Sequence, residues 1–294
     1  MEAPHQQWRA EALWEQLSPL LPGISIEVLA RTDSTNTALL ERVRNEARGE
    51  RQSYGRRSHD MQPCLLVAEH QTQGRGRMGR AWLSTAGGGS LTFSIGLVMD
   101  MADWSGLSLA VGCAVAEALE PLNELPAGAK PRLQLKWPND IWLDGRKLGG
   151  ILIETVPAGA QRMAIIGIGL NISDLAAPED TSPAHFNTGF AALSEFFPHE
   201  TSAPDVLARI APVLARALRD FPQTGFASWQ AAYAQRDLTL NRAVSAGTLE
   251  GISRGVDATG VLQVETSPGT IQPVSGGEIS VRLATAPASQ PGKD

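Results

Sequence analysis

Apolar and polar positions recur with two different periods along the chain, and each period predicts one kind of element. A period near 3.6 residues predicts a helix over about 105–120, with Leu107 and Val111 on its buried face. The same period predicts an amphipathic helix over 203–221. Pro212 lies inside this second helix and should kink it, because its ring removes a backbone hydrogen bond.

Shorter patterns predict the rest of a mixed α/β fold. Helices are expected over 8–17 and from Asp33 or Ser34 onwards. Apolar runs predict strands at 25–30, 64–69, 90–98 and 162–173, and a hairpin over 133–156 with DGRK (144–147) at its tip. Loops are expected over 48–62, which carries four arginines, and over 174–203, which contains one short helix.

The chain changes character after residue 236, where long helical patterns give way to short strands separated by turn residues. We therefore expect a larger α/β (α+β) domain with a mixed sheet over 1–236. A small β-barrel should follow over 237–284, and the last residues, 285–294, form a polar tail that should be disordered.

Composition excludes several classes of protein. The 294 residues include 25 basic and 31 acidic side chains, and the net charge of −6 offers no general attraction for nucleic acid. Cys64 and Cys113 both lie in apolar runs, which indicates buried thiols and a reducing, cytoplasmic compartment. Neither a secretory signal nor an apolar run of about 18 residues is present, so we expect no membrane span.

Residues 74–79, GRGRMG, match the spacing of a dinucleotide-binding turn. Such a turn needs a helix after its last glycine, so that the helix N-terminus can hold the pyrophosphate. Gly79 is instead followed by RAWLSTAGGGS, which contains three consecutive glycines and no helical period. We therefore predict a strand–loop–strand segment and reject the dinucleotide interpretation.

The same loop carries Arg75, Arg77 and Arg80 between glycines. Guanidinium groups present fork-shaped donors to carboxylate and phosphate oxygens, and glycine lets the backbone approach a ligand closely. The pattern is typical of a loop that encloses an anion. The alternative is a mobile surface loop whose charges are simply solvated.

Three further stretches contain candidate chemistry. In 135–154, Asp140 follows a Pro-Asn turn and could hold Mg²⁺ through water or only cap the turn. Lys147 precedes a glycine pair and an apolar strand, where it needs an anion unless it points to solvent from the hairpin tip. In 165–172 alternating glycines indicate a close approach, and Asn171 could bind a ligand or end the strand in a turn. TDSTN (32–36) could contact a ligand or only cap a helix.

Together these stretches resemble the biotin–protein ligase family. The matching elements are TDSTN, EHQTQGRGRMGRAW, LKWPNDIWLDGRKLGGILIE and IGIGLN, followed by LEGISRGVDATG and VSGGEISVRL, over about 25–283. The resemblance implies a catalytic mixed-sheet domain followed by an SH3-like barrel. It also implies the reaction: biotin and ATP give biotinyl-5′-AMP, and the biotinyl group then passes to a lysine of a biotin carboxyl carrier protein.

The resemblance implies a role for each matching residue. Lys147, Arg75 and Asp140 are the expected catalytic residues, with Lys147 bridging the carboxylate and the α-phosphate. The expected biotin contacts are Ser34, Thr35, Asn36, Gln71, Arg75, Gly76, Arg77 and Lys147. The expected nucleotide contacts are Arg75, Arg77, Arg80, Trp82 and Asn171. Mg²⁺ is expected as a cofactor beside ATP and biotin, with no metal ligand assigned in the chain.

Repressor members of the family carry an N-terminal helix-turn-helix domain. About 24 residues precede the first expected strand here, too few for that domain, so we expect a ligase that does not bind DNA. A lipoate or octanoate ligase would share the general fold without this arginine loop. A regulatory biotin-binding protein would not need Lys147. The sequence leaves open the acceptor protein, a homodimer, and the roles of 48–62 and Pro212.

Overall fold

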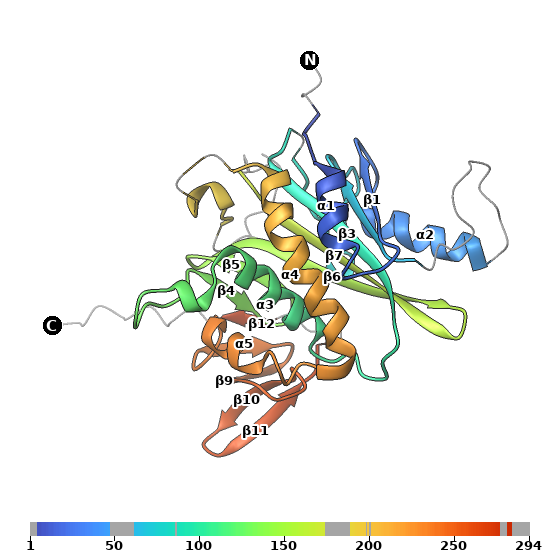
Figure 1. Cartoon of the computed structure of the whole chain (residues 1–294). Coiled ribbons are helices and arrows are strands. Elements are labelled where there is room, and N and C mark those ends of the chain that lie inside the picture. The colour runs from blue at the N-terminus through green and yellow to red at the C-terminus, as the bar shows by residue number, and fades with distance from the viewer. Residues whose placement is uncertain are drawn as a thin grey trace.

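The computed structural model describes residues 5–47, 62–85, 87–173, 189–197, 199, 201–276 and 281–283. The chain forms two sheets with helices packed around the larger one (Figure 1). The helices are α1 (Ala10–Leu17), α2 (Thr35–Ala47), α3 (Leu107–Leu119), α4 (Ala203–Thr224) and α5 (Gln230–Arg236). Short 3-10 turns occur at Arg77–Gly79, Leu122–Glu124 and Leu193–Glu195.

The larger sheet has seven strands in the order β1-β2-β3-β7-β6-β5-β4. Their bounds are β1 (Ser25–Leu29), β2 (Cys64–Ala68), β3 (Ser90–Met99), β4 (Leu133–Lys136), β5 (Asp140–Leu143), β6 (Arg146–Ala158) and β7 (Gln161–Asn171). Strands β1 and β2 are parallel and every other neighbouring pair is antiparallel, so the sheet is mixed, as the sequence predicted.

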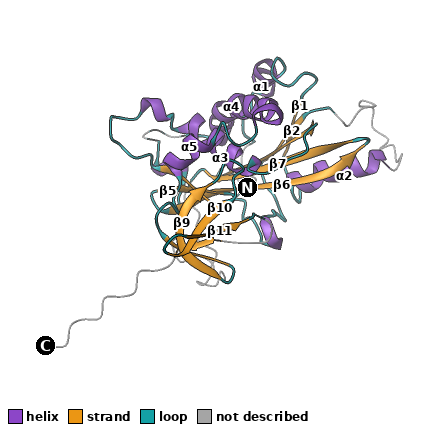
Figure 2. Ribbon diagram, turned by 90° about the horizontal axis from the view of Figure 1, so that it is seen from below, coloured by secondary structure: helices purple, strands orange, loops and turns teal. Residues whose placement is uncertain are grey.

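Both faces of this sheet are covered, and the alternation of side chains along β2 shows how. Leu65 and Val67 belong to the main core with α1, α3 and α4, which lie on one side of the sheet (Figure 2). Leu66, between them, points to the opposite face and packs with Leu39 and Val43 of α2. Successive residues of a strand face opposite sides, so one short strand contributes to two cores.

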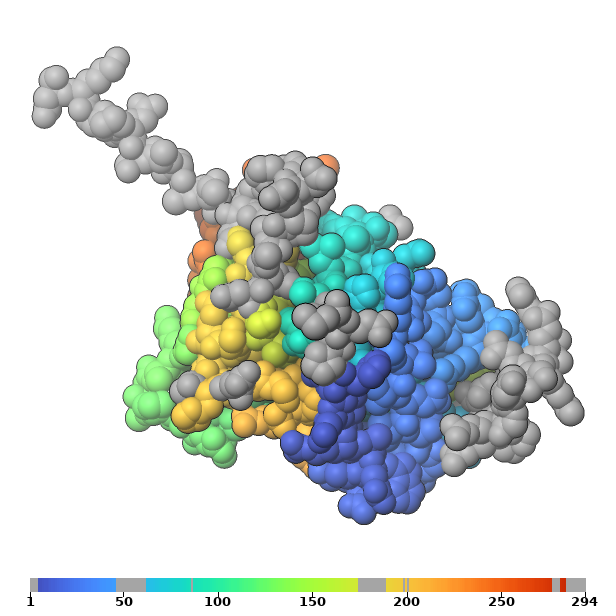
Figure 3. Space-filling model, turned by 90° about the horizontal axis from the view of Figure 1, so that it is seen from above, coloured from blue at the N-terminus to red at the C-terminus, as the bar shows by residue number. Residues whose placement is uncertain are grey.

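Helix α4 packs against both α1 and α3, and Figures 1 and 3 show it beside the N-terminal segment, which is far away in sequence. Its apolar stripe includes Leu207, Ile210 and Leu214, all fully buried. The predicted helix is confirmed, and it continues through Pro212 to Thr224 without ending at the proline. Helix α5 follows it and had no clear signal in the sequence.

The second sheet has five antiparallel strands in the order β11-β10-β9-β8-β12. The strands are β8 (Ala243–Ala246), β9 (Leu249–Val256), β10 (Leu262–Ser267), β11 (Thr270–Val274) and β12 (Val281–Leu283). All five strands lie after residue 236, in a sheet separate from the larger one. It contacts the larger sheet where Trp137 Nε1 donates to the Gly260 carbonyl at 3.0 Å and the backbone N–H of Leu238 donates to the Leu135 carbonyl at 2.9 Å.

Cys64 and Cys113 are free and buried, as predicted. Burial raises the pKa of the Cys64 thiol from 9.0 to about 11 and that of Cys113 to about 12. Reaction with a disulfide reagent requires the thiolate. We therefore expect neither thiol to react with Ellman's reagent in the native protein at pH 8, and both to react in guanidinium. Because burial raises both folded-state pKa values, the buried neutral thiols contribute to stability below about pH 9. This stabilisation is lost as the pH rises from about 9 to about 11 for Cys64 and to about 12 for Cys113. Fast native labelling would contradict the burial.

Among the described helices, none combines the length and the apolar character needed to cross a membrane.

Candidate active site

The predicted motifs meet on one face of the seven-stranded sheet, where Gly150, Gly167 and Gly169 leave room above the strands. Gly150 pairs with Asp140 on one side and with Gly169 on the other. A Cβ on Gly169 would lie 2.4 Å from the indole ring of Trp82, and a Cβ on Gly167 would lie 2.2 Å from Asn36 Oδ1. The space above Gly167 and Gly169 of β7 is therefore occupied by Asn36 and Trp82. These contacts hold the start of α2 and the arginine loop against the sheet.

A buried polar cluster forms at the start of α2. Gln71 Oε1 accepts hydrogen bonds from the Thr35 backbone N–H at 2.7 Å and from the Thr35 hydroxyl at 3.1 Å. The Ser94 hydroxyl lies 2.6 Å from both Thr35 Oγ1 and Asn36 Oδ1. Ser34 takes the expected capping position, with the Thr37 N–H 3.5 Å from its hydroxyl. The structure thus joins TDSTN to Gln71 and adds Ser94.

Sequence reasoning missed Ser94, although a signal was present. It is one of three hydroxyl residues in the buried strand β3, with Ser90 and Thr92, and it is fully buried. A buried hydroxyl needs a hydrogen-bond partner, so its position indicated a polar neighbour on that face of the sheet.

The arginine loop contains no helix. Within 74–85 and 87–89 only the 3-10 turn Arg77–Gly79 occurs, with Met78 at φ 58°, which confirms the rejection of the dinucleotide turn. Arg75 Nη2 donates to Glu154 Oε1 at 2.9 Å and its Nη1 donates to Thr37 Oγ1 at 3.2 Å. The loop is therefore tied to the sheet and to α2, and Arg75 is not a simply solvated charge.

Arg77 lies at the junction of the two sheets. Its Nη1 donates to Asn139 Oδ1 at 3.2 Å, and its Nη2 donates to the carbonyl of Gly276 beyond β11. Burial lowers the pKa of Arg77 from its ordinary value, although the guanidinium stays charged at neutral pH. Arg80 and Met78, by contrast, are exposed.

Lys147 is partly buried rather than solvated at the hairpin tip. Its ammonium lies 2.7 Å from Asp140 Oδ1, and its side chain is 32% exposed. The Asp140 carboxylate therefore balances a cation in this structure. Lys136 lies on the neighbouring strand over the Trp142 ring, at 5.1 Å, and burial lowers its pKa. Lys147 and Lys136 thus lie close to the Asp140 carboxylate, as expected for a region that receives an anionic ligand.

Two predicted nucleotide contacts contain buried polar atoms without a partner among the described residues. They are the indole N–H of Trp82 and Oδ1 of Asn171. The Asn171 amide nitrogen donates to the Ala191 carbonyl at 3.0 Å, so its orientation is fixed. Buried polar groups are normally paired, and a donor and an acceptor left open beside the sheet can serve a ligand.

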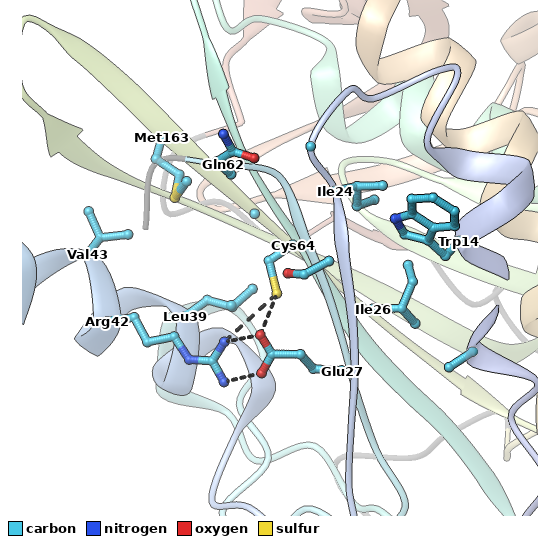
Figure 4. Close-up of a pocket in the computed structure, with 14 residues that line it drawn as sticks. Trp14, Ile24, Ile26, Glu27, Leu39, Arg42, Val43, Gln62, Cys64 and Met163 are labelled. Carbon is cyan, nitrogen blue, oxygen red and sulfur yellow. Dashed lines mark hydrogen bonds and ion pairs between the residues drawn. The ribbon is translucent and has the colours of Figure 1, made fainter. Parts of the chain in front are cut away.

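A pocket of about 500 Å³ lies away from these residues at the other end of β2 and β3 (Figure 4). Cys64 and Gly96 line it and pair with each other, four residue pairs from Ala68 and Thr92 near the site. Its two charged side chains pair with each other, with Arg42 Nη2 2.8 Å from Glu27 Oε2. It brings together none of the predicted site residues.

Comparison with known proteins identifies the class. The model of the biotin/lipoate A/B protein ligase family matches residues 28–171, and that of the biotin protein ligase C terminal domain matches 239–282. The fold and the matched regions therefore define a ligase of the biotin/lipoate class.

Individual relatives narrow this class to the biotin ligases. The bifunctional ligase/repressor BirA of Escherichia coli is 35% identical over 276 residues, covering 92% of this chain and 78% of that protein. The biotin–[acetyl-CoA-carboxylase] ligase of Mycobacterium tuberculosis is 34% identical over 86% of this chain and 88% of its own length. The solved biotin protein ligase from Aquifex aeolicus, in complex with biotin and ATP, superposes with a TM-score of 0.67 at 27% identity, covering 88% of this chain and 99% of that one. This chain belongs to the biotin–protein ligase family.

Proposed function

We propose that the chain activates biotin with ATP and then transfers the biotinyl group to a lysine of a biotin carboxyl carrier protein. In the first step a biotin carboxylate oxygen attacks the α-phosphorus of ATP, and pyrophosphate leaves. In the second step the acceptor amine attacks the acyl carbon, loses a proton and expels AMP. The observation that supports this most is the placement of Arg75 and the Lys147–Asp140 pair on the sheet face that also holds the polar cluster of Thr35, Gln71 and Asn36.

Each part of the site suits one part of the first step. The polar cluster offers donors and acceptors of the kind that a ureido ring requires. Lys147 would lie between the carboxylate and the α-phosphate, where its charge offsets their repulsion and stabilises the transition state. Trp82 and Asn171 would contact the nucleotide through the polar atoms that are unpaired here. The arginine loop would cover the mixed anhydride and keep water away from it.

Mg²⁺ would enter bound to ATP, since this ion usually keeps substrate phosphates and water among its ligands. The described residues include no cluster of three His, Cys, Asp or Glu side chains. Asp140 and Glu154, the carboxylates of the site, are each paired with a cation. We therefore assign no residue of the chain as a metal ligand.

We further propose a division into a ligase domain over 1–236 and an SH3-like domain over 237–284. The matches of the two family models and the start of the second sheet at Ala243 support this division. The expected tail, 285–294, and most of the 48–62 loop lie outside the described residues. The two free buried thiols support a cytoplasmic location, and the net charge of −6 supports a ligase that does not act on DNA. We also propose that the chain can form a homodimer.

The test is ATP–pyrophosphate exchange with purified protein and Mg²⁺, in which biotin, lipoate and octanoate are compared. Exchange that depends on biotin alone supports the proposal. Exchange with an eight-carbon acid would reassign the chain to lipoate chemistry. Tight binding of biotin without exchange would favour a regulatory protein.

Arg75→Ala should release the adenylate early. Without the guanidinium, the loop loses its contacts with Glu154 and Thr37, and the biotinyl-AMP loses a charge-assisted hydrogen bond. We expect release to accelerate about tenfold or more, with the melting temperature little changed. Single-turnover reactions with labelled biotin, separated by rapid filtration, measure the retained intermediate. Unchanged retention would remove Arg75 from the closing loop.

A further inference from the structure

Glu154 joins two parts of the site that are far apart in the sequence. It lies on β6, with its side chain 22% exposed, and each carboxylate oxygen accepts from a different residue. Oε1 accepts from Arg75 Nη2 at 2.9 Å, and Oε2 accepts from Asn36 Nδ2 at 2.9 Å. One carboxylate thus contacts both the arginine loop and the first turn of α2.

The contact with Asn36 fixes which way its amide faces. Asn36 Nδ2 donates to the Leu152 carbonyl at 3.2 Å as well as to Glu154, so both nearby groups are acceptors. The carbonyl oxygen, Oδ1, must then face the opposite way, where it lies 2.6 Å from the Ser94 hydroxyl. Without the Glu154 carboxylate, the Leu152 carbonyl would be the one remaining acceptor of the two that fix the orientation of the Asn36 amide.

The contact with Arg75 fixes the loop. Glu154 and Thr37 engage two of the N–H groups of the guanidinium, which has about five in all. The group is held in place while further donors stay available to an anion. Thr37 and Asn36 are neighbours in α2, so the loop and the polar cluster share one anchor.

We propose that Glu154 is a positioning residue for the ligase reaction. It orients the Asn36 amide beside the ring-binding cluster and the Arg75 guanidinium beside the acyl phosphate, and so couples recognition of the ring to closure of the loop. The inference rests on the proposed function. The residue acts through Asn36 and Arg75 and takes no part in bond formation.

The test is Glu154→Gln, which keeps the size of the side chain. Glutamine has one acceptor oxygen and one donor amide, whereas Asn36 and Arg75 both donate, so one of them must lose its partner. We expect the KM for biotin and the release rate of biotinyl-AMP to rise about tenfold, the effect of one charge-assisted hydrogen bond. The KM for ATP and the melting temperature should stay near wild type. An equal rise in both KM values with a fall in melting temperature would mean a structural role and overturn the proposal.

The matched control is Glu27→Gln. Glu27 also pairs with an arginine of α2, Arg42, at 2.8 Å, but Arg42 lies six residues further along the helix than Asn36 (Figure 4). This variant should change neither KM nor adenylate release. In an Arg75→Ala background, Glu154→Gln should add no further acceleration of release. Additive effects would show that the two residues act independently and would overturn the coupling.

A measurement without ligand separates this inference from the proposed function. Arg75, Arg77 and Arg80 are trypsin sites, and anchoring by Glu154 should protect the first of them. We expect cleavage after Arg75 in the free protein to be several-fold faster in Glu154→Gln than in wild type or Glu27→Gln. Equal rates would overturn the anchor. Faster cleavage in a protein whose wild type shows no biotin-dependent exchange would retain the anchor and reject only the ligase chemistry.

Discussion

Replacing Lys147 by alanine should lower biotin-dependent ATP–pyrophosphate exchange by roughly a thousandfold, the upper range for removing one group that stabilises transition-state charge. In the proposed reaction two anionic groups, a carboxylate and a phosphate, must approach each other. The ammonium of Lys147 is the cation placed for this, 2.7 Å from Asp140 and beside Gly150. Its removal would also leave the Asp140 carboxylate facing the incoming anions.

The fold should survive this change, because the Lys147–Asp140 pair is partly exposed and such pairs stabilise proteins by only about 1 kcal/mol or less. Thermal unfolding measured by circular dichroism checks this point. Lys130→Ala, which removes an exposed lysine elsewhere, is the control and should retain full exchange. A Lys147→Ala protein that keeps a tenth or more of wild-type exchange would disprove the assigned role.

Replacing Arg236 by alanine should destabilise the protein by about 3–5 kcal/mol, the usual effect of removing one partner of a buried ion pair. Arg236 is 1% exposed at the end of α5. Its Nη1 donates to Glu120 Oε2 and to the Leu133 carbonyl, each at 3.0 Å, and its Nη2 donates to the Glu120 carbonyl. The variant would leave the Glu120 carboxylate buried with only backbone donors.

Glu120 in turn accepts from the backbone N–H groups of Arg132 and Leu133, so the network joins α5, α3 and β4. Urea unfolding followed by tryptophan fluorescence measures the loss. Arg254→Ala is the control, because Arg254 pairs with Glu265 at the surface and should cost less than about 1 kcal/mol. Similar midpoints for the two variants would show that the buried network contributes little.

The local elements follow from short-range patterns. The 3.6-residue period of α3 and the apolar runs of β2, β3 and β7 placed these elements within a few residues of their observed bounds. The amphipathic period also predicted the helix through Pro212, although a proline usually ends or kinks a helix. Burial of Leu207, Ile210 and Leu214 against the core stabilises α4 through Thr224.

The candidate site was predictable in part, because its chemistry lies in long continuous motifs. Lys147, Asp140 and the arginine loop were named from residue type and spacing alone. The sequence could not predict which side chains pack against the alternating glycines of β7. These side chains, Trp82 and Asn36, come from segments more than 80 residues away.

By itself, then, the sequence determined most of the helices and strands, the change to a small β-rich unit and the residues able to bind an anion. These properties depend on neighbours a few positions apart. Only the tertiary structure decided which side chains share a contact. Ser94 and Arg236 lie in no motif, and Glu154 ends the stretch LKWPNDIWLDGRKLGGILIE without an expected role of its own. Each acquires its role because strands and helices distant in sequence bring donors and acceptors within about 3 Å of one another.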